Sequence, residues 1–453
     1  MQFDLLAVER QELIFKLWLS ILLQKEPEQT ACQLAEKHRP GNGLTAERWK
    51  TGRYNATYRV KYDDGFQAIV RFAAVGPSVH RPEKVENEAV VLQYLREYTD
   101  IPVPRVLGVG KIALGPYIVE EFIEGDLASD LFIESRTEPQ NLNPDISEQQ
   151  LKALYREMAK IMLEMSKPEF PRIGSLMKTE NGYSIDRRPL TQHLNELALK
   201  ANIGPFHFPP FMWTNSAAYF ESLVQQHLTQ LRYQRNNCVK DEHDFKEKYI
   251  ARCLFLRIAL FMALNYSTGP FRLFCEDFRP SNVIANTEPF HINAVIDLEF
   301  TYAAPSAFTY AAPWWLLLQD PEQWEFDLKG AFLTRFTPRL RLFLEALREV
   351  EQEQIKNEKL TKAQRLSKRM EKSMENGLFW FCIAIRNSQM FDKIYWTFLD
   401  EKFFGPLGKL EDRIELLDEE EKSELSTFYE IKKEQAKDGT IEFVYEAGDQ
   451  VKY

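Results

Sequence analysis

The stretch from Cys275 to Asn282 (Cys-Glu-Asp-Phe-Arg-Pro-Ser-Asn) combines residue types that could carry out chemistry. Asp277 and Asn282 stand five positions apart around a proline, and a second carboxylate, Asp297, follows an apolar run. Phosphoryl transfer needs such a set, because one carboxylate orients the attacking hydroxyl and accepts its proton while oxygen ligands hold Mg²⁺. We therefore expect Asp277 to be the base, and Asn282 and Asp297 to bind the metal. An isolated Asp before a proline could also be a turn or helix cap.

The segments around this set are expected to bring its members together. Residues 283–285 and 292–296 are apolar and short enough to pair as a two-stranded ribbon, which would place Asn282 and Asp297 at one edge. Arg279 lies two positions after the expected base. It could meet the transferred phosphoryl group or the acidic metal site, and it could equally be an exposed, uninvolved arginine.

Upstream, residues 44–125 have the pattern of a small antiparallel sheet with one helix. Residues 57–62 and 66–72 alternate as strands around an Asp-Asp-Gly turn, 82–98 has the helical period, and 101–107 and 117–123 are extended. From Ser147 onward the chain is mostly helical, beginning with a Ser147/Gln150 capping box. We expect an N-terminal helical extension at 1–43, a nucleotide-binding sheet at 44–125, a helical lobe at 126–335 and a helical C-terminal extension at 336–453.

Three features of the sheet region indicate a nucleotide site. Glu88 interrupts an apolar helix face and so calls for a buried cation, for which Arg71 is the candidate, although a plain surface glutamate is the alternative. Gly52 lies between two expected strands, where backbone N–H groups could cover phosphates. The segment 120–123 should form the hinge between lobes, with Glu121 and Ile123 offering backbone groups to adenine.

Composition excludes several classes of protein. The net charge is −10 and no Lys/Arg block carries interleaved aromatic residues, which argues against nucleic-acid binding. Five scattered cysteines without a Cys-x-x-Cys pair fit a reducing compartment, and acidic residues precede the apolar run 13–23, so no signal peptide or membrane span is expected. We expect a cytoplasmic protein; the oligomeric state cannot be read from the sequence.

At these residues the sequence resembles the aminoglycoside phosphotransferase family of small-molecule kinases, and in particular its fungal-type members. The resemblance covers roughly residues 45–310 and matches Gly52 and Asn55 to the family's phosphate loop, Glu88 to its helix glutamate, and Asp277, Asn282 and Asp297 to its base and metal ligands. It implies an α+β, protein-kinase-like bilobal fold: a small antiparallel sheet with one helix, then a large, mostly helical lobe. It also implies ATP- and Mg²⁺-dependent phosphorylation of a hydroxyl on a small molecule.

Two departures from the family pattern keep other functions open. The usual lysine of the sheet is Arg71, and the usual histidine before the base is Cys275. Arginine is a planar fork and not a compact ammonium, so the phosphate geometry would change. One alternative is a pseudokinase that acts as a binding module. The other alternative is a protein kinase, although no long activation segment follows Asp297.

Overall fold

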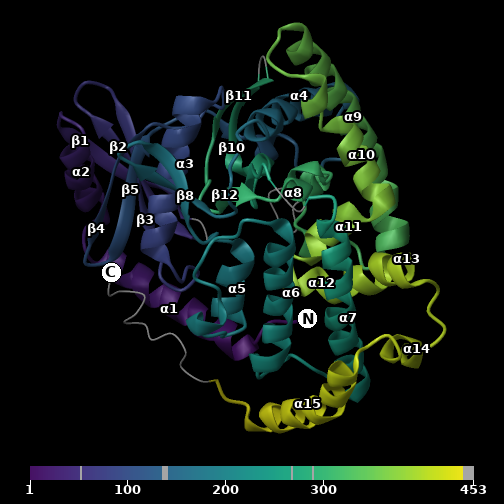
Figure 1. The fold of residues 1–453 in the computed structure, drawn as a ribbon. Coiled ribbons are helices and arrows are strands. Elements are labelled where there is room, and N and C mark those ends of the chain that lie inside the picture. Colours follow the sequence, from purple (N-terminus) through teal and green to yellow (C-terminus); the bar gives the residue numbers. More distant parts are fainter. Residues whose placement is uncertain (52–53, 135–140, 267–268, 288–289, 442–453) are drawn as a thin grey trace.

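The structure is a computed structural model that describes residues 1–51, 54–134, 141–266, 269–287 and 290–441. Two lobes follow one another along the chain, and the smaller holds a five-stranded antiparallel sheet (Figure 1). Its spatial order is β1-β2-β3-β5-β4, with bounds β1 Gly43–Thr51, β2 Asn55–Tyr62, β3 Gln67–Ala73, β4 Val106–Ile112 and β5 Gly115–Glu121.

Strand alternation gives this sheet its two faces. Even-numbered residues of β2 and β3, such as Tyr58 and Val70, are fully buried against helices α1 (Leu5–Leu23) and α2 (Pro27–His38). Odd-numbered residues of the same strands, such as Thr57 and Arg71, line a cavity on the other face. Because successive side chains of a strand point to opposite faces, one sequence pattern makes both the core and the cleft. Helix α3 (Arg81–Tyr98) packs on β4 and β5.

The larger lobe is mostly helical, as expected. Ser147 caps α4 with the predicted box, because its hydroxyl accepts the backbone N–H of Gln150. The long helices are α4 Glu148–Met165, α5 Gln192–Lys200, α6 Ser216–Tyr233, α7 Glu242–Ala263, α9 Leu333–Lys356, α10 Ser367–Asn376 and α15 Glu419–Asp438. The short ones are α8 Ser306–Tyr310, α11 Leu378–Ala384, α12 Ser388–Ile394, α13 Asp400–Phe404 and α14 Leu410–Ile414.

Short strands in this lobe hold the residues expected to do chemistry. The bounds are β6 Asp126–Leu127, β7 Ser175–Thr179, β8 Gly182–Arg187, β9 Arg272–Cys275, β10 Val283–Thr287, β11 Phe290–Val295 and β12 Thr301–Ala304. The pair β10–β11 is the predicted ribbon. The pair β9–β12 and the hairpin β7–β8 were not expected from the sequence.

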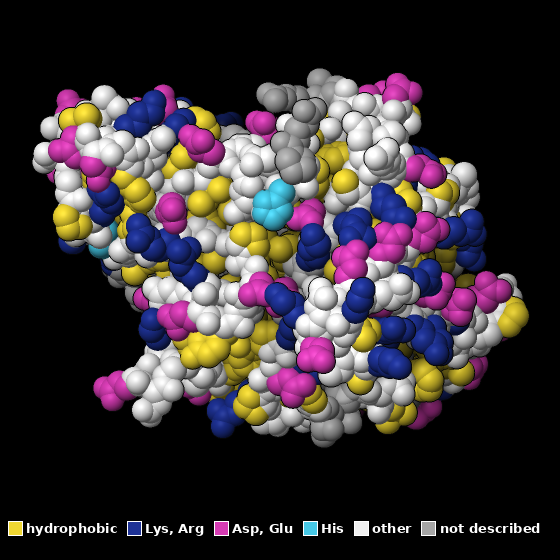
Figure 2. Space-filling model, turned by 90° about the horizontal axis from the view of Figure 1, so that it is seen from above, with side chains coloured by type: hydrophobic (Ala, Val, Ile, Leu, Met, Phe, Trp, Pro, Cys, Tyr) yellow, Lys and Arg dark blue, Asp and Glu magenta, His cyan; other side chains and the backbone are white. Residues whose placement is uncertain are grey.

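The two lobes give the α+β, protein-kinase-like bilobal fold that the sequence predicted. The expected domain boundaries near residues 43, 125 and 335 stay predictions, and the last of them falls inside α9. Within the described part of the chain, no helix is both long and apolar enough to span a membrane. On the face seen in Figure 2, basic and acidic side chains are interspersed.

Candidate active site

The ribbon β10–β11 brings the two expected metal ligands to the same end. Val283 pairs with Val295, so Asn282 precedes one strand and Asp297 follows the other. The Ile296 N–H donates to the Asn282 carbonyl at 3.0 Å, which extends the pairing to the ligands themselves. Asp297 has a φ of +55°, a left-handed conformation that Asp tolerates better than most residues. This backbone turn directs the chain away from the ribbon into β12.

Asp277 lies two residues after the end of β9 and is held from two sides. The Asn282 side-chain amide donates to Asp277 Oδ2 at 3.0 Å and to its backbone carbonyl at 2.8 Å, while Arg279 Nε lies 3.0 Å from Oδ1. Burial raises the pKa of Asp277 to about 6, against the opposing effect of Arg279. With 22% of its side chain exposed, the carboxylate can still reach a substrate. A poised carboxylate near neutral pH suits a general base.

Arg279 is engaged by two carboxylates. Besides Asp277, its guanidinium contacts Asp320, and its Cζ lies 5.9 Å from the ring centre of Trp314. Burial alone would lower the pKa of Arg279, but the two carboxylates raise it. Arg279 is therefore not a fully exposed arginine but contacts the expected base directly, and its part in the chemistry stays a prediction.

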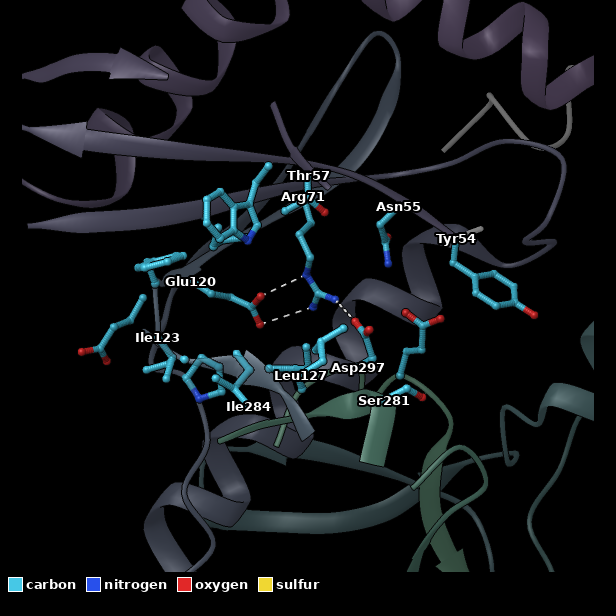
Figure 3. Close-up of a pocket in the computed structure, with 18 of the residues that line it drawn as sticks. Tyr54, Asn55, Thr57, Arg71, Glu120, Ile123, Leu127, Ser281, Ile284 and Asp297 are labelled. Atoms are coloured by element: carbon cyan, nitrogen blue, oxygen red, sulfur yellow. Dashed lines mark hydrogen bonds and ion pairs between the residues drawn. The ribbon is translucent and has the colours of Figure 1, made fainter. Parts of the chain in front are cut away.

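Arg71 joins three carboxylates at the back of the cleft. Its guanidinium lies 2.6 Å from Glu88, 3.0 Å from Glu120 and 2.5 Å from Asp297, and Figure 3 shows the last two contacts. Burial would lower the pKa of Arg71, but these carboxylates raise it well above its usual value. The predicted pairing with Glu88 is present. Arg71 also links the sheet and α3 to residues 297–301, the segment that begins with the expected metal ligand Asp297 and is called the metal segment below.

Sequence reasoning placed Glu120 in the hinge but missed it as a partner of Arg71, although the strand pattern indicated that partnership. Arg71 is paired with Ile118 across β3 and β5, so Ile118 and Glu120, two residues apart, share one face of the sheet. Glu120 is 5% exposed, and burial raises the pKa of its carboxyl. A buried carboxylate on the arginine's face calls for that arginine as its partner.

Helix α3 contacts the metal segment through one row of side chains. Lys84 Nζ lies 3.0 Å from Glu299 Oε2, and the Asn87 side-chain amide donates to the backbone carbonyls of Glu299 (2.9 Å) and Thr301 (3.1 Å). Carboxylate oxygens of Glu88, Asp297 and Glu299 lie within 4.8 Å of one another. Such oxygen donors match the ligand preference of Mg²⁺. Lys84 and Glu299 were not singled out in the sequence.

Two cavities meet at these residues. The first, about 260 Å³, lies between the lobes and takes in the four predicted residues Asn55, Arg71, Glu121 and Ile123. The second, about 510 Å³, lies in the larger lobe and takes in Arg279 and Asn282. Both cavities share the following wall residues: Tyr54, Asp277, Ser281 and Asp297.

Two predicted residues line neither of these cavities in the described part of the chain. Glu88 does not line either cavity and sits behind Arg71, and Gly52 lies outside the described residues.

The backbone N–H groups of the expected hinge differ in their pairing. The Glu121 and Phe122 N–H groups donate to backbone carbonyls. The Ile123 N–H has no backbone partner among the residues that the structure describes.

Comparison with solved structures finds several phosphotransferases of low similarity. Amicoumacin kinase hAmiN, solved with AMP-PNP, Ca²⁺ and Ami, is 13% identical over 92% of this chain and 96% of its own, with a TM-score of 0.43. Macrolide 2'-phosphotransferase MphH from Brachybacterium faecium is 11% identical over 85% and 100%, with a TM-score of 0.39. A mutant aminoglycoside 2'-phosphotransferase-IIIa, solved with GDP, is 12% identical over 88% and 99%, with a TM-score of 0.40.

The family assignment rests on the sequence itself. No curated protein matches the chain at a significant level. The model of the phosphotransferase enzyme family matches residues 45–343, about two thirds of the chain, and that range contains both cavities' shared residues. The chain belongs to the phosphotransferase enzyme family.

Proposed function

We propose that the protein transfers the γ-phosphoryl group of ATP to a hydroxyl group of a small molecule. The observation that carries this proposal is the meeting of two cavities at the carboxylates of Asp277, the expected base, and Asp297. A transferase needs a donor site and an acceptor site that share the reacting centre, because the attacking and leaving oxygens lie in line across the phosphorus. The interlobe cavity is the proposed nucleotide site, and the larger one is the proposed acceptor site.

Asp277 is the proposed base. The acceptor hydroxyl hydrogen-bonds to the carboxylate, its oxygen forms a bond to the γ-phosphorus, the bond from phosphorus to the bridging oxygen breaks, and the proton passes to Asp277. ADP and a phosphate monoester result. Asn282 donates to Oδ2 of the carboxylate, and Arg279 forms an ion pair with its Oδ1, so both residues fix its position. Positioning of this kind lowers the barrier by removing the need to reorganise during the reaction.

The residues present also fit a magnesium ion. Asn282 uses its amide N–H₂ on Asp277, which leaves its amide oxygen as the possible ligand. Asp297, at the same end of the ribbon, supplies a carboxylate that is 40% exposed. Bound there, Mg²⁺ would neutralise charge on the transferred group.

The nucleotide is proposed to lie along the interlobe cavity. Ile123 and Glu121 would offer a backbone N–H and C=O to adenine, and Asn55, at the start of β2, would lie beside the phosphates. Arg71 would reach them as the replacement for the family's lysine. Since its fork is shared by Glu88, Glu120 and Asp297, it would also set the distance between sheet and metal segment.

The second candidate, a nucleotide-binding or interaction module, is favoured by one observation. Arg71 contacts Asp297, so the expected metal ligand already has a cationic partner. A chain in which that contact persists would bind nucleotide without the metal and would not turn over.

Titration calorimetry with ATP, with and without Mg²⁺, tests the proposal. Wild type and Asp100→Ala, a change at an exposed carboxylate, should bind ATP more tightly with Mg²⁺, and Asp297→Ala should lose that dependence. Metal-independent binding in all three proteins would support the module instead. Absence of any ATP binding would overturn the nucleotide site.

A further inference from the structure

A third cavity lies beside the proposed acceptor site, under the N-terminal helix α1. It measures about 200 Å³ and is enclosed by α1, the loop between β3 and α3, and α5. Three of its wall residues, Tyr54, Glu196 and Lys200, also belong to the acceptor cavity. The two spaces are therefore neighbours that share one wall.

Helix α1 is fixed over this cavity at both ends of the contact. The Asp4 N–H donates to the Lys200 carbonyl at 3.0 Å, and Arg10 donates to Asn202 at 2.6 Å. On the other side, Gly76 approaches α1 so closely that a Cβ there would lie 2.6 Å from the Gln11 carbonyl oxygen. These contacts hold the cavity's roof in place without filling the space.

The loop that forms the floor is fixed to α5 as well. Asn195 donates its side-chain amide to the Pro77 carbonyl at 2.8 Å and accepts the Val79 N–H at 3.0 Å. Asn195 is 4% exposed, so this bracket is part of the core. The cavity is consequently a built feature of the fold.

The walls combine apolar side chains, three charged side chains and one unsatisfied acceptor. Val8, Phe15 and Leu199 contribute apolar surface. Gln11 is 7% exposed, and its Oε1 has no hydrogen-bond partner among the described residues. Leaving a buried acceptor unpaired is unfavourable, and an N–H group of a ligand in the cavity could satisfy it.

The size of the space limits what it can hold. An apolar cavity of about 150 Å³ takes a benzene molecule. A cavity of about 200 Å³ therefore has room for one ring with a small polar substituent. The cavity is too small for a nucleotide. Tyr54 is a wall residue of both this cavity and the interlobe cavity.

We propose that this cavity is a distal subsite of the acceptor site, which takes an apolar ring bearing an N–H donor. The ring would be the far end of an elongated alcohol whose hydroxyl lies at Asp277. The proposal rests on the proposed function. Helix α1, which forms the cavity's roof, lies outside the residues 45–343 that the family model matches.

Benzamide is a suitable probe, because it combines one ring with an amide N–H₂. Its binding can be followed by saturation-transfer NMR on wild type, Val8→Phe and Gln11→Leu. Val8→Phe fills the cavity and should abolish the signal. Gln11→Leu removes the acceptor and should weaken binding roughly five- to tenfold, as expected for one hydrogen bond. Leu13→Phe, on the outer face of α1 and 66% exposed, makes the same kind of change outside the cavity and should leave the signal intact.

Hydroxyalkyl benzamides of increasing chain length, offered with ATP and Mg²⁺, then connect the subsite to the acceptor site. A chain of suitable length should be phosphorylated, and Val8→Phe should raise its KM at least about tenfold, with kcat and the KM for ATP unchanged. Equal benzamide binding by wild type and Val8→Phe, or no binding to wild type, would overturn the subsite. Binding without phosphorylation at any chain length would overturn its link to the acceptor.

A separate titration with ATP and Mg²⁺ keeps the two ideas apart. If wild type bound no nucleotide while benzamide binding still depended on Val8, the proposed function would be refuted and the assignment to an acceptor site with it. If nucleotide bound normally and benzamide did not, only the subsite would fail.

Discussion

Arg71 carries the charge balance of the cleft at the scale of single residues. Its planar fork lets one side chain contact Glu88, Glu120 and Asp297 at once. An ammonium also has three donors, but on a single nitrogen, so its partners would have to gather around one point. Because Glu88 and Glu120 are almost completely buried, each depends on this cation.

Replacing Arg71 should therefore destabilise the fold strongly. In Arg71→Met, Glu88 and Glu120 would be buried without a cation, and loss of one partner from such a pair costs about 3–5 kcal/mol. Adding Glu120→Leu should recover part of the loss, since it removes one stranded carboxylate. Urea unfolding of wild type and both variants measures the change in the free energy of unfolding. A cost below about 1 kcal/mol, as for an exposed ion pair, would contradict the description.

Asp277 should give the reaction its pH dependence. Burial raises its pKa to about 6, and the base must be deprotonated, so kcat/KM should rise with pH through about 6 and then level off. Arg279 opposes the effect of burial, so Arg279→Gln should raise the pKa further and move the rise to higher pH. A profile that is unchanged in Arg279→Gln, or flat from pH 5 to 7, would exclude Asp277 as the titrating group.

At the scale of elements, α3 and the segment after β11 behave as one unit. The row Lys84, Asn87 and Glu88 on α3 reaches Glu299, Thr301 and, through Arg71, Asp297. Residues three and four positions apart on a helix share one face, so a single helix side holds the whole segment. The position of α3 thus fixes the position of the expected metal ligand.

Asn87→Leu tests this connection. The change keeps the size of the side chain and removes two donors from buried carbonyls, which should cost roughly 1–3 kcal/mol. It should also weaken Mg²⁺-dependent ATP binding, because Asp297 loses support. Gln93→Leu, on a more exposed part of the same helix, should cost less than about 0.5 kcal/mol. Equal effects from both changes would show that α3 does not hold the segment.

At the scale of the whole molecule, α1 joins the two lobes. The Trp18 indole N–H donates to the Leu114 carbonyl of the sheet lobe at 3.0 Å, while the Asp4 N–H donates to Lys200 in the helical lobe. Figure 1 shows α1 running below the sheet lobe toward α5. Since both lobes contribute to the cleft, a helix fixed to both restrains how far the cleft can open.

Two glycines provide a matched test of this joint. Gly76 (φ +103°) has no room for a Cβ against α1, whereas Gly65 (φ +84°) has nothing within 4 Å of that position. Both Gly→Ala changes carry the penalty of a left-handed conformation, about 1–2 kcal/mol. Only Gly76→Ala also displaces α1, which should add about 1–3 kcal/mol. Equal thermal stabilities of the two variants would mean that α1 is not held at Gly76.

Local spacing made the catalytic ribbon and the Arg71–Glu88 pair predictable. The ribbon depends on residues 282–297 alone, and the pair depends on a strand followed directly by a helix. Contacts across the cleft were not predictable, because Arg71 and Asp297 are 226 positions apart and meet only in the folded chain. The packing position of α1 could not be predicted either. Its apolar run includes buried Trp18 and exposed Leu17, and a helical period does not indicate which part of the protein the helix packs against.

The most direct test of the central claim is ³¹P NMR of ATP, Mg²⁺ and a panel of hydroxylated small molecules, with wild type and Asp277→Asn compared on the same acceptor. We predict a phosphate monoester signal with wild type and a rate roughly 10²- to 10⁴-fold lower with Asp277→Asn, as expected for loss of a general base. Asp100→Asn, at an exposed position, should match wild type. Equal monoester formation by wild type and Asp277→Asn would contradict the claim that Asp277 directs the transfer.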